Sequence, residues 1–304
     1  MLEWLEITPE LTLVATATRA YLHVPRQFGA DPFQEPMRGG GSAETTHWLL
    51  EAAVAAASRA FVGQSRTSAD DSSPSPGSSA LVSAANWSYR LAGYYHTTHA
   101  TQRLLPVIAR RFASFGRELP ALWAQRKMTE EAGHDQLALR DLTELGYHAE
   151  GVVRAFVPPR AAAWVALFEQ LAAAADPVGC IGYAHALERL ALLRGPAEIS
   201  AIERGLPAGV NATRCLRAHS ALGGDTHHVR TNVELAAALD ADERRTIANA
   251  CYLTARIYFD PSLDDDFRSA GLEAKVLAFR GSTRPLPNFS SDLNLTNSRQ
   301  PEHN

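Results

Sequence analysis

Residues 130–135 read Glu-Glu-Ala-Gly-His-Asp and lie within a long stretch of helical apolar periodicity. Glu131 and His134 are three residues apart, so one α-helix would place them about 60° apart on the same face. A carboxylate and an imidazole in this arrangement are typical of the Glu-x-x-His motif that binds iron or manganese in helical bundles. The same spacing occurs on ordinary solvated helix surfaces, so the motif indicates a metal site only together with further ligands.

Around this motif the pattern is helical from residue 80 to residue 280. The breaks carry glycine or proline stop signals, and the predicted helices are 80–115, 118–146, 160–175, 178–194, 211–223, 226–239, 241–259 and 264–279. A further helix, capped by Ser42, is expected to run to Phe61. No run of alternating β-branched residues indicates a strand, so a sheet is not expected. The predicted fold is an all-α bundle of about seven to nine helices.

Composition divides the chain into three parts. Residues 1–79 include prolines, the Gly39–Gly41 run and a Ser/Pro-rich stretch at 67–79, which predict an irregular N-terminal extension with one helix and a linker. Residues 80–280 are the predicted helical, metal-binding catalytic domain. Residues 281–304 are rich in Asn, Ser and Pro and are expected to form a disordered tail.

Charge and cysteine usage exclude several classes of protein. The net charge is −4, from 29 basic and 33 acidic residues, so the sequence lacks the excess of basic residues typical of proteins that bind nucleic acid or an anionic membrane. Cys180, Cys215 and Cys251 are too scattered for a zinc or redox motif and are expected to be small buried hydrophobes. Neither a signal peptide nor an apolar run of ~20 residues is evident. We therefore expect a cytoplasmic protein with a small-molecule substrate and no nucleic-acid or membrane partner; a homodimer is compatible with the sequence.

Further potential ligands follow at helical spacing. His185 and Glu188 are three residues apart, and Asp225 and His228 repeat this spacing shortly after His219. Glu188 lies among leucines, where an unpaired carboxylate is costly, so a ligand role is favoured over an ion pair with an arginine. Asp225 follows two glycines and fits an N-cap equally well. Oxygen and nitrogen ligands without thiolates favour iron or manganese over structural zinc.

The 80–115 helix contains no acidic residue. It offers His96 and His99, which share a helix face and are candidates either for metal binding or for a supporting role in the core. Arginines near the proposed ligands are able to hold a substrate carboxylate, although surface salt bridges are the commoner role. The candidate substrate-binding residues are Tyr95, His185, Arg126, Arg140 and Arg189.

The run from Lys127 to Gly146 resembles the heme-oxygenase-like di-iron oxidases and oxygenases, also called iron-containing redox enzymes. Residues 182–188 resemble the helix of that family that bears the next carboxylate ligand, and residues 219–228 resemble its closing His…Asp-x-x-His segment. The resemblance covers roughly residues 85–260 and implies a heme-oxygenase-like bundle. The iron ligands it implies are Glu131, His134, Glu188, His219, Asp225 and His228.

Two departures from the family pattern concern the second iron. The family usually places a Glu on the first bundle helix, where this chain offers only His96 or His99. The family's closing motif has three residues between His and Asp, whereas five residues separate His219 from Asp225. On a regular helix a six-residue step rotates the side chain by about 240°, although Gly223-Gly224 could break the helix. Two Fe(II) ions are expected, and a single ion is the alternative.

The resemblance implies a non-heme di-iron oxidoreductase that uses Fe(II) and O₂, with an external electron donor where the reaction needs one. The implied substrates are amino acids, amines or fatty-acid-like molecules of specialised-metabolite biosynthesis. N-oxygenation, desaturation and carbon–carbon cleavage all stay open. The alternatives are a metal-free enzyme of the same fold, either a cofactorless oxidase or a thiamin-degrading hydrolase with a cavity-facing cysteine, and a non-catalytic metal- or partner-binding protein. A heme oxygenase would instead need one proximal histidine without the set of carboxylates.

Overall fold

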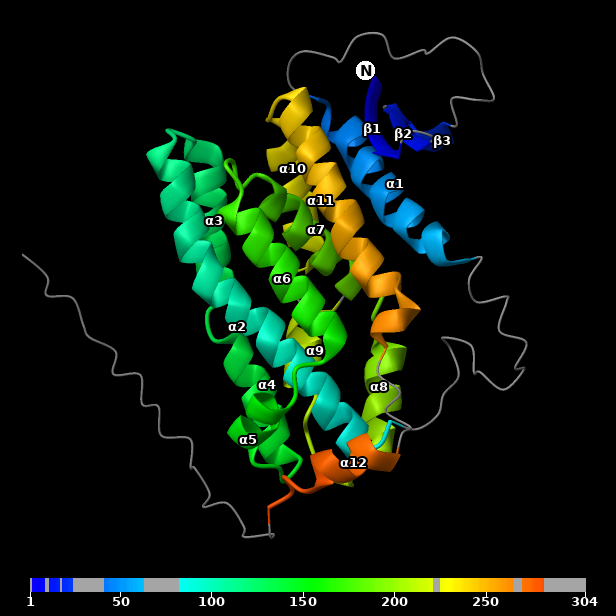
Figure 1. Cartoon of the computed structure of the whole chain (residues 1–304), viewed down its shortest axis with the longest axis vertical. Helices are drawn as coiled ribbons and strands as arrows, with labels where there is room; N and C mark the ends of the chain where they lie inside the picture. The colour runs from blue at the N-terminus through cyan, green and yellow to red at the C-terminus, as the bar shows by residue number, and fades with distance from the viewer. Residues whose placement is uncertain are drawn as a thin grey trace, which may run out of the picture.

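The computed structural model describes residues 2–8, 11–16, 18–23, 41–62, 82–220, 225–264 and 270–281. These residues form a bundle of α-helices with a small antiparallel sheet on one side (Figure 1). The all-α architecture predicted for residues 80–280 is confirmed for the part of the chain that is described there. The predicted linker at 67–79 lies outside the described residues, as does the predicted tail apart from its first residue.

The longest helix, α2 (Ala84–Ser114), runs along one side of the bundle (Figure 1). Its first turn is capped by Ser83, whose side chain accepts a hydrogen bond from the backbone N–H of Asn86. Because α2 extends over both hydrophobic cores of the bundle, it holds the two halves together. The helices that contact α2 most extensively are α3 (Glu118–Glu130), α4 (His134–Glu144) and α6 (Pro159–Ala173).

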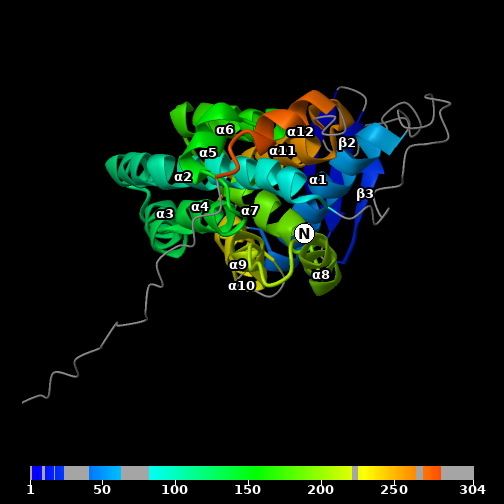
Figure 2. The same ribbon diagram turned by 90° about the horizontal axis from the view of Figure 1, so that it is seen from below.

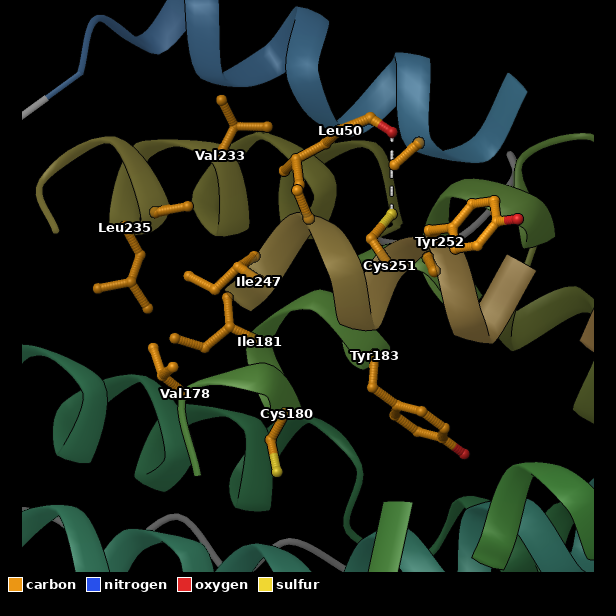
Figure 3. Packing of buried hydrophobic residues seen from close by; sticks show 14 of the residues in the cluster. Leu50, Val178, Cys180, Ile181, Tyr183, Val233, Leu235, Ile247, Cys251 and Tyr252 are labelled. Carbon is orange, nitrogen blue, oxygen red and sulfur yellow. Dashed lines mark hydrogen bonds between the residues drawn. The ribbon is translucent and has the colours of Figure 1, made fainter. Parts of the chain in front are cut away.

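The larger core is built around α7 (Gly179–Ala191) and α11 (Ala241–Phe259), which pack directly on each other. At their crossing a Cβ on Gly182 would lie 2.0 Å from the backbone oxygen of Ile247, so only glycine permits this approach. Figure 3 shows Ile181 and Ile247 meeting at the same interface. The helices α1 (Ala43–Val62) and α10 (Asp225–Ala237) complete this core.

The smaller core lies between the first turns of α2 and the shorter helices. Trp87 is fully buried there and donates a hydrogen bond from Nε1 to the backbone oxygen of Ala212 at 2.6 Å. This core therefore fixes the segment that leads into His219. The shorter helices are α5 (Ala149–Ala155), α8 (Pro196–Gly205), α9 (Arg214–Ala218) and α12 (Ala270–Leu277), with a 3₁₀ turn at Pro261–Leu263.

The prediction of an irregular N-terminus without a sheet is wrong for the described residues. Strands β1 (Leu2–Thr8), β2 (Leu11–Thr16) and β3 (Ala20–His23) form an antiparallel sheet in the order β1-β2-β3. Ile7 and Val14 are the β-branched apolar residues of these strands, and most other apolar positions are leucine or alanine, so the sequence shows no run of alternating β-branched residues. Leu5 and Leu13 bury against α1 and its neighbours. Figure 2 shows this sheet beside α1, on the side of the bundle away from α3.

The predicted helices 118–146 and 211–223 are also corrected. The first is two helices, because Gly133 adopts φ +79° and separates α3 from α4. The second is shortened to α9, which ends at Ala218 with His219 as its C-cap. The predicted Ser42 cap of α1 is confirmed, since the Ser42 hydroxyl accepts a hydrogen bond from the backbone N–H of Thr45 at 3.0 Å. Within the described residues, no single helix meets the length and hydropathy needed to cross a membrane, and the one helix pair that does so jointly, α5 with α6, is bent by 75°.

Candidate metal centre and adjoining cavity

Three predicted ligands come together in the interior. A potential ligand atom from each of Glu131, His134 and His219 lies within 4.8 Å of the other two. His134 Nδ1 is 2.9 Å from Glu131 Oε2, and the rings of His134 and His219 meet edge to face with centroids 4.6 Å apart. Two imidazoles and one carboxylate are the ligand set of mononuclear non-heme Fe(II) oxygenases.

A break between helices creates this arrangement. Glu131 is the C-cap of α3 and His134 is the first residue of α4, with the left-handed Gly133 between them. The two side chains therefore converge across a turn rather than along one helix face, which corrects the geometry expected from their spacing. The partial negative charge of the α3 C-terminus favours a cation at this point.

Burial keeps the His219 imidazole neutral. It lowers the pKa of His219 to about 4, although the neighbouring Glu131 charge opposes the shift. His219 Nε2 is buried without a hydrogen-bond partner among the described residues. A buried polar atom left in this state is uncommon in proteins. A neutral imidazole with a free lone pair is the form that binds a metal ion, so the burial and position of His219 suit a ligand.

Glu131 is held as a carboxylate. Burial alone would raise the pKa of Glu131, but the hydrogen bond with His134 and the charges around His219, His134 and Lys127 lower it to about 2. Glu131 is thus ionised and His219 neutral at pH 7, the forms in which a carboxylate and an imidazole bind a metal ion.

Asp141 positions the short helix that carries His219. Its carboxylate is fully buried and accepts hydrogen bonds from the backbone N–H of Cys215 at 2.9 Å and from Arg214 Nη1 at 3.1 Å. Both partners belong to the first turn of α9, so Asp141 ties α4 to α9. The orientation of His219 therefore depends on a residue that does not touch the candidate centre.

Glu188 is placed differently from the prediction. Lys127 Nζ lies 2.6 Å from Glu188 Oε1 and 2.7 Å from Glu130 Oε2, and Asn232 donates a hydrogen bond to Glu188 Oε2 at 2.6 Å. Burial lowers the pKa of Lys127, but the charges and hydrogen bonds of Glu188 and Glu130 outweigh it and raise the pKa, so the ammonium stays charged. Glu188 is in a buried ion pair with a lysine, where the sequence favoured a metal ligand.

His228 belongs to this ion-paired group. Its Nε2 lies 3.4 Å from Glu130 Oε2, and its Nδ1 lies 3.8 Å from Glu188 Oε1. Burial and the charge of Lys127 lower the pKa of His228. Asp225 begins α10, but its side chain lies outside the described residues. The predicted six-ligand set is therefore brought together only in part.

The two histidines of α2 make their hydrogen bonds with residues outside the cluster. His96 Nε2 is 2.9 Å from the backbone oxygen of Val153, and His99 is exposed with its Nδ1 3.0 Å from Asp135 Oδ2. Both predicted metal candidates are thus occupied by other contacts. The face of α2 that meets the cavity instead carries Tyr94, Thr97, Thr98, Thr101 and Leu105.

A cavity of about 130 Å³ adjoins the centre. Its charged and titratable lining includes Glu131, His219, Lys127, Glu188 and Arg194. The rest is mostly apolar and aromatic; Phe168 and Tyr183 stack with centroids 4.4 Å apart. Apolar walls with a few convergent polar groups are typical of small-molecule sites.

The predicted substrate-binding residues lie outside this cavity. Tyr95 stacks on His99, and Arg126 and Arg140 are exposed. Arg189 is paired with both carboxylate oxygens of Glu51 on α1. His185 is fully buried on the α1 side of α7, where Glu51, His47 and Arg189 are its charged neighbours.

Sequence reasoning missed Lys127 and Arg194, which both line the cavity. Lys127 is four residues before Glu131, so its presence on the same helix face was a usable signal. Arg194 lies beyond the end of α7 at Ala191, where helical periodicity no longer places a side chain.

Comparison with known proteins supports the fold. No family model matches the chain, and no curated protein matches it. A solved structure from Shewanella denitrificans, described as a domain of unknown function with a heme oxygenase-like fold, is similar at a TM-score of 0.52 and 19% identity. The alignment covers 77% of this chain and 97% of that structure. The chain therefore has a heme oxygenase-like fold, as its sequence predicts.

Proposed function

We propose that Glu131, His134 and His219 hold one Fe(II) ion, and that the protein is an O₂-dependent oxidase or oxygenase of a small organic substrate. The main support is the juxtaposition of three donor atoms within 4.8 Å with a cavity that Glu131 and His219 line directly. An Fe(II) ion on such a ligand set supplies redox chemistry with O₂ while keeping coordination positions open.

The residues of the chain contribute binding and exclusion of water. The aromatic walls hold an apolar substrate beside the cluster and keep bulk water out. Insertion of one oxygen atom of O₂ reduces the other atom to water, so an external electron donor belongs to the proposal.

Lys127 is the reason for proposing one ion rather than two. Its ammonium already neutralises Glu188 and Glu130, the carboxylates that a second metal ion would need. A second divalent cation would have to displace the buried Lys127 ammonium. The desolvated carboxylates would then lose their existing ion-pair partner, which is unfavourable.

The metal-free alternative has less support. All three cysteines are buried in the cores and none lines the cavity, so the residues do not fit a thiamin-degrading nucleophile. Burial also raises the pKa of each thiol, whereas a reactive cysteine has a lowered pKa.

The test is O₂ uptake by anaerobically Fe(II)-loaded protein supplied with ascorbate. We expect uptake well above that of the His219→Ala variant. His185→Gln is the matched control, because His185 is also buried with a low pKa but faces α1. Iron that binds tightly without O₂ uptake would contradict the proposal and favour a non-catalytic metal-binding protein.

A further inference from the structure

Arg194 lines the cavity beside Tyr94, whose ring centroid lies 5.3 Å from its guanidinium carbon. A second, outer pocket of about 410 Å³ shares Tyr94, Thr97, Trp164, Arg194 and Tyr258 with the cavity. The two spaces therefore adjoin, and Arg194 lines both of them.

Arg194 differs from the other two arginines of the outer pocket. Arg90 is paired with Glu198 at 3.3 Å, and Arg160 with Asp264 at 2.7 Å. Arg194 has no carboxylate within salt-bridge distance among the described residues, and its Nη1 is buried there without a hydrogen-bond partner. Its guanidinium hydrogen-bonds with Tyr258, its carbon lies 5.3 Å from the ring centroid of Tyr94, and Glu198 acts on it only at longer range.

A buried guanidinium without a counter-ion is costly unless something pairs with it. The hydroxyl groups of Tyr94 and Tyr183, also on the cavity wall, are likewise buried without a partner among the described residues. Unsatisfied polar atoms gathered on one cavity indicate a polar ligand.

We propose that the substrate is a carboxylic acid whose carboxylate binds Arg194 and whose apolar body fills the aromatic cavity. A single guanidinium matches a monoanionic carboxylate in charge and in its paired N–H donors. The position at which the substrate is oxidised rests on the proposed function, whereas the binding of its carboxylate by Arg194 does not.

The helix α2 gives the length of the substrate. Tyr94 contacts Arg194, while Gln102 donates a hydrogen bond to the backbone oxygen of Glu131 at 3.2 Å. These two residues are eight positions apart on α2, which corresponds to roughly 12 Å along its axis. The carboxylate is therefore held far from the metal centre, and oxidation falls on a carbon or nitrogen remote from the acid group.

The test is calorimetric binding to metal-free protein. The probes are decanoate and 4-phenylbutanoate, each compared with the alcohol of the same skeleton. We expect at least one acid to bind at least ~10-fold more tightly than its alcohol. Arg194→Gln should remove that preference while leaving alcohol binding unchanged, which also shows that the variant is folded.

Arg160→Gln is the matched control, since Arg160 lines only the outer pocket and has its own carboxylate. It should keep the acid preference. Equal binding of acid and alcohol, an unchanged preference in Arg194→Gln, or no binding of either acid would overturn the proposal. Because no metal is present, failure of the iron proposal would leave this result unaffected.

Discussion

Lys127 Nζ lies 2.6 Å from Glu188 Oε1 in the interior of the bundle, where both side chains are almost fully buried. This pair joins α3 to α7 and places a fixed positive charge next to the Glu131–His134–His219 cluster. A second metal ion beside the candidate centre would need the carboxylates of Glu188 and Glu130, and both are already paired with Lys127.

Removing one member of the pair should be more harmful than removing both. Lys127→Met leaves Glu188 buried without its ammonium partner and should lower the free energy of unfolding by about 3 kcal/mol. The double variant Lys127→Met/Glu188→Leu should regain most of that loss. Urea unfolding followed by circular dichroism measures both. A double variant as unstable as the single one would show that the pair is not the source of the effect.

Gly182 should tolerate no side chain. Gly182→Ala forces the backbone of α11 away at Ile247 and should cost about 1–3 kcal/mol of stability. Gly271 in α12 has open space around its Cβ position, so Gly271→Ala is the control and should be neutral or slightly stabilising. Thermal unfolding of both variants checks this. Equal melting temperatures would contradict the close α7–α11 approach.

His185 should make the protein acid-sensitive. Burial lowers its pKa to about 4, despite the opposing charge of Glu51, and His47 and Arg189 lower it further. In the unfolded chain the His185 imidazole therefore binds a proton below pH ~6.5, whereas in the folded chain it does so only below pH ~4. The stabilisation is complete above pH ~6.5 and is lost as the pH falls, by on the order of 3 kcal/mol.

Urea unfolding at a series of pH values tests this acid sensitivity. Between pH ~4 and ~6.5 the free energy of unfolding of His185→Gln should depend on pH less steeply than that of the wild type, by the equivalent of close to one bound proton. An unchanged slope would mean that His185 does not stay neutral in the fold.

Asp141 should affect metal affinity without touching the metal. Asp141→Asn weakens the link to Arg214 and to the backbone of Cys215, so His219 is held less firmly, and Fe(II) affinity should fall about 10-fold. Glu144→Gln is the control, because Glu144 contacts the same Arg214 at 3.4 Å from a more exposed position. Equal Fe(II) affinities in a competition titration would contradict a positioning role for Asp141.

Much of the fold was predictable because the helix-breaking signals are local. The Ser42 cap and the break after Gly146 follow from short-range chemistry. The sheet was not predictable, because its leucine-rich strands are recognised only through their packing on α1. Gly133 was visible in the sequence, but nothing local showed that it would adopt a positive φ and separate two helices.

The candidate site was predictable only as a list of residue types. Glu131, His134 and His219 were identified, yet their convergence depends on the turn at Gly133 and on Asp141. For His96 and His99, the face that meets the cavity is set by how α2 is rotated in the bundle, and each residue step turns a side chain by about 100°. Charge partners separated by tens of residues, such as Lys127 with Glu188, cannot be paired without the tertiary structure.

The most direct measurement is the number of Fe(II) ions bound per chain after anaerobic loading. We predict close to one ion in the wild type and in Glu188→Gln, whose carboxylate is committed to Lys127, and close to none in His219→Ala. Two ions in the wild type, with one lost in Glu188→Gln, would contradict the single-ion account in favour of a di-iron centre. No bound iron in the wild type would contradict the metal centre itself.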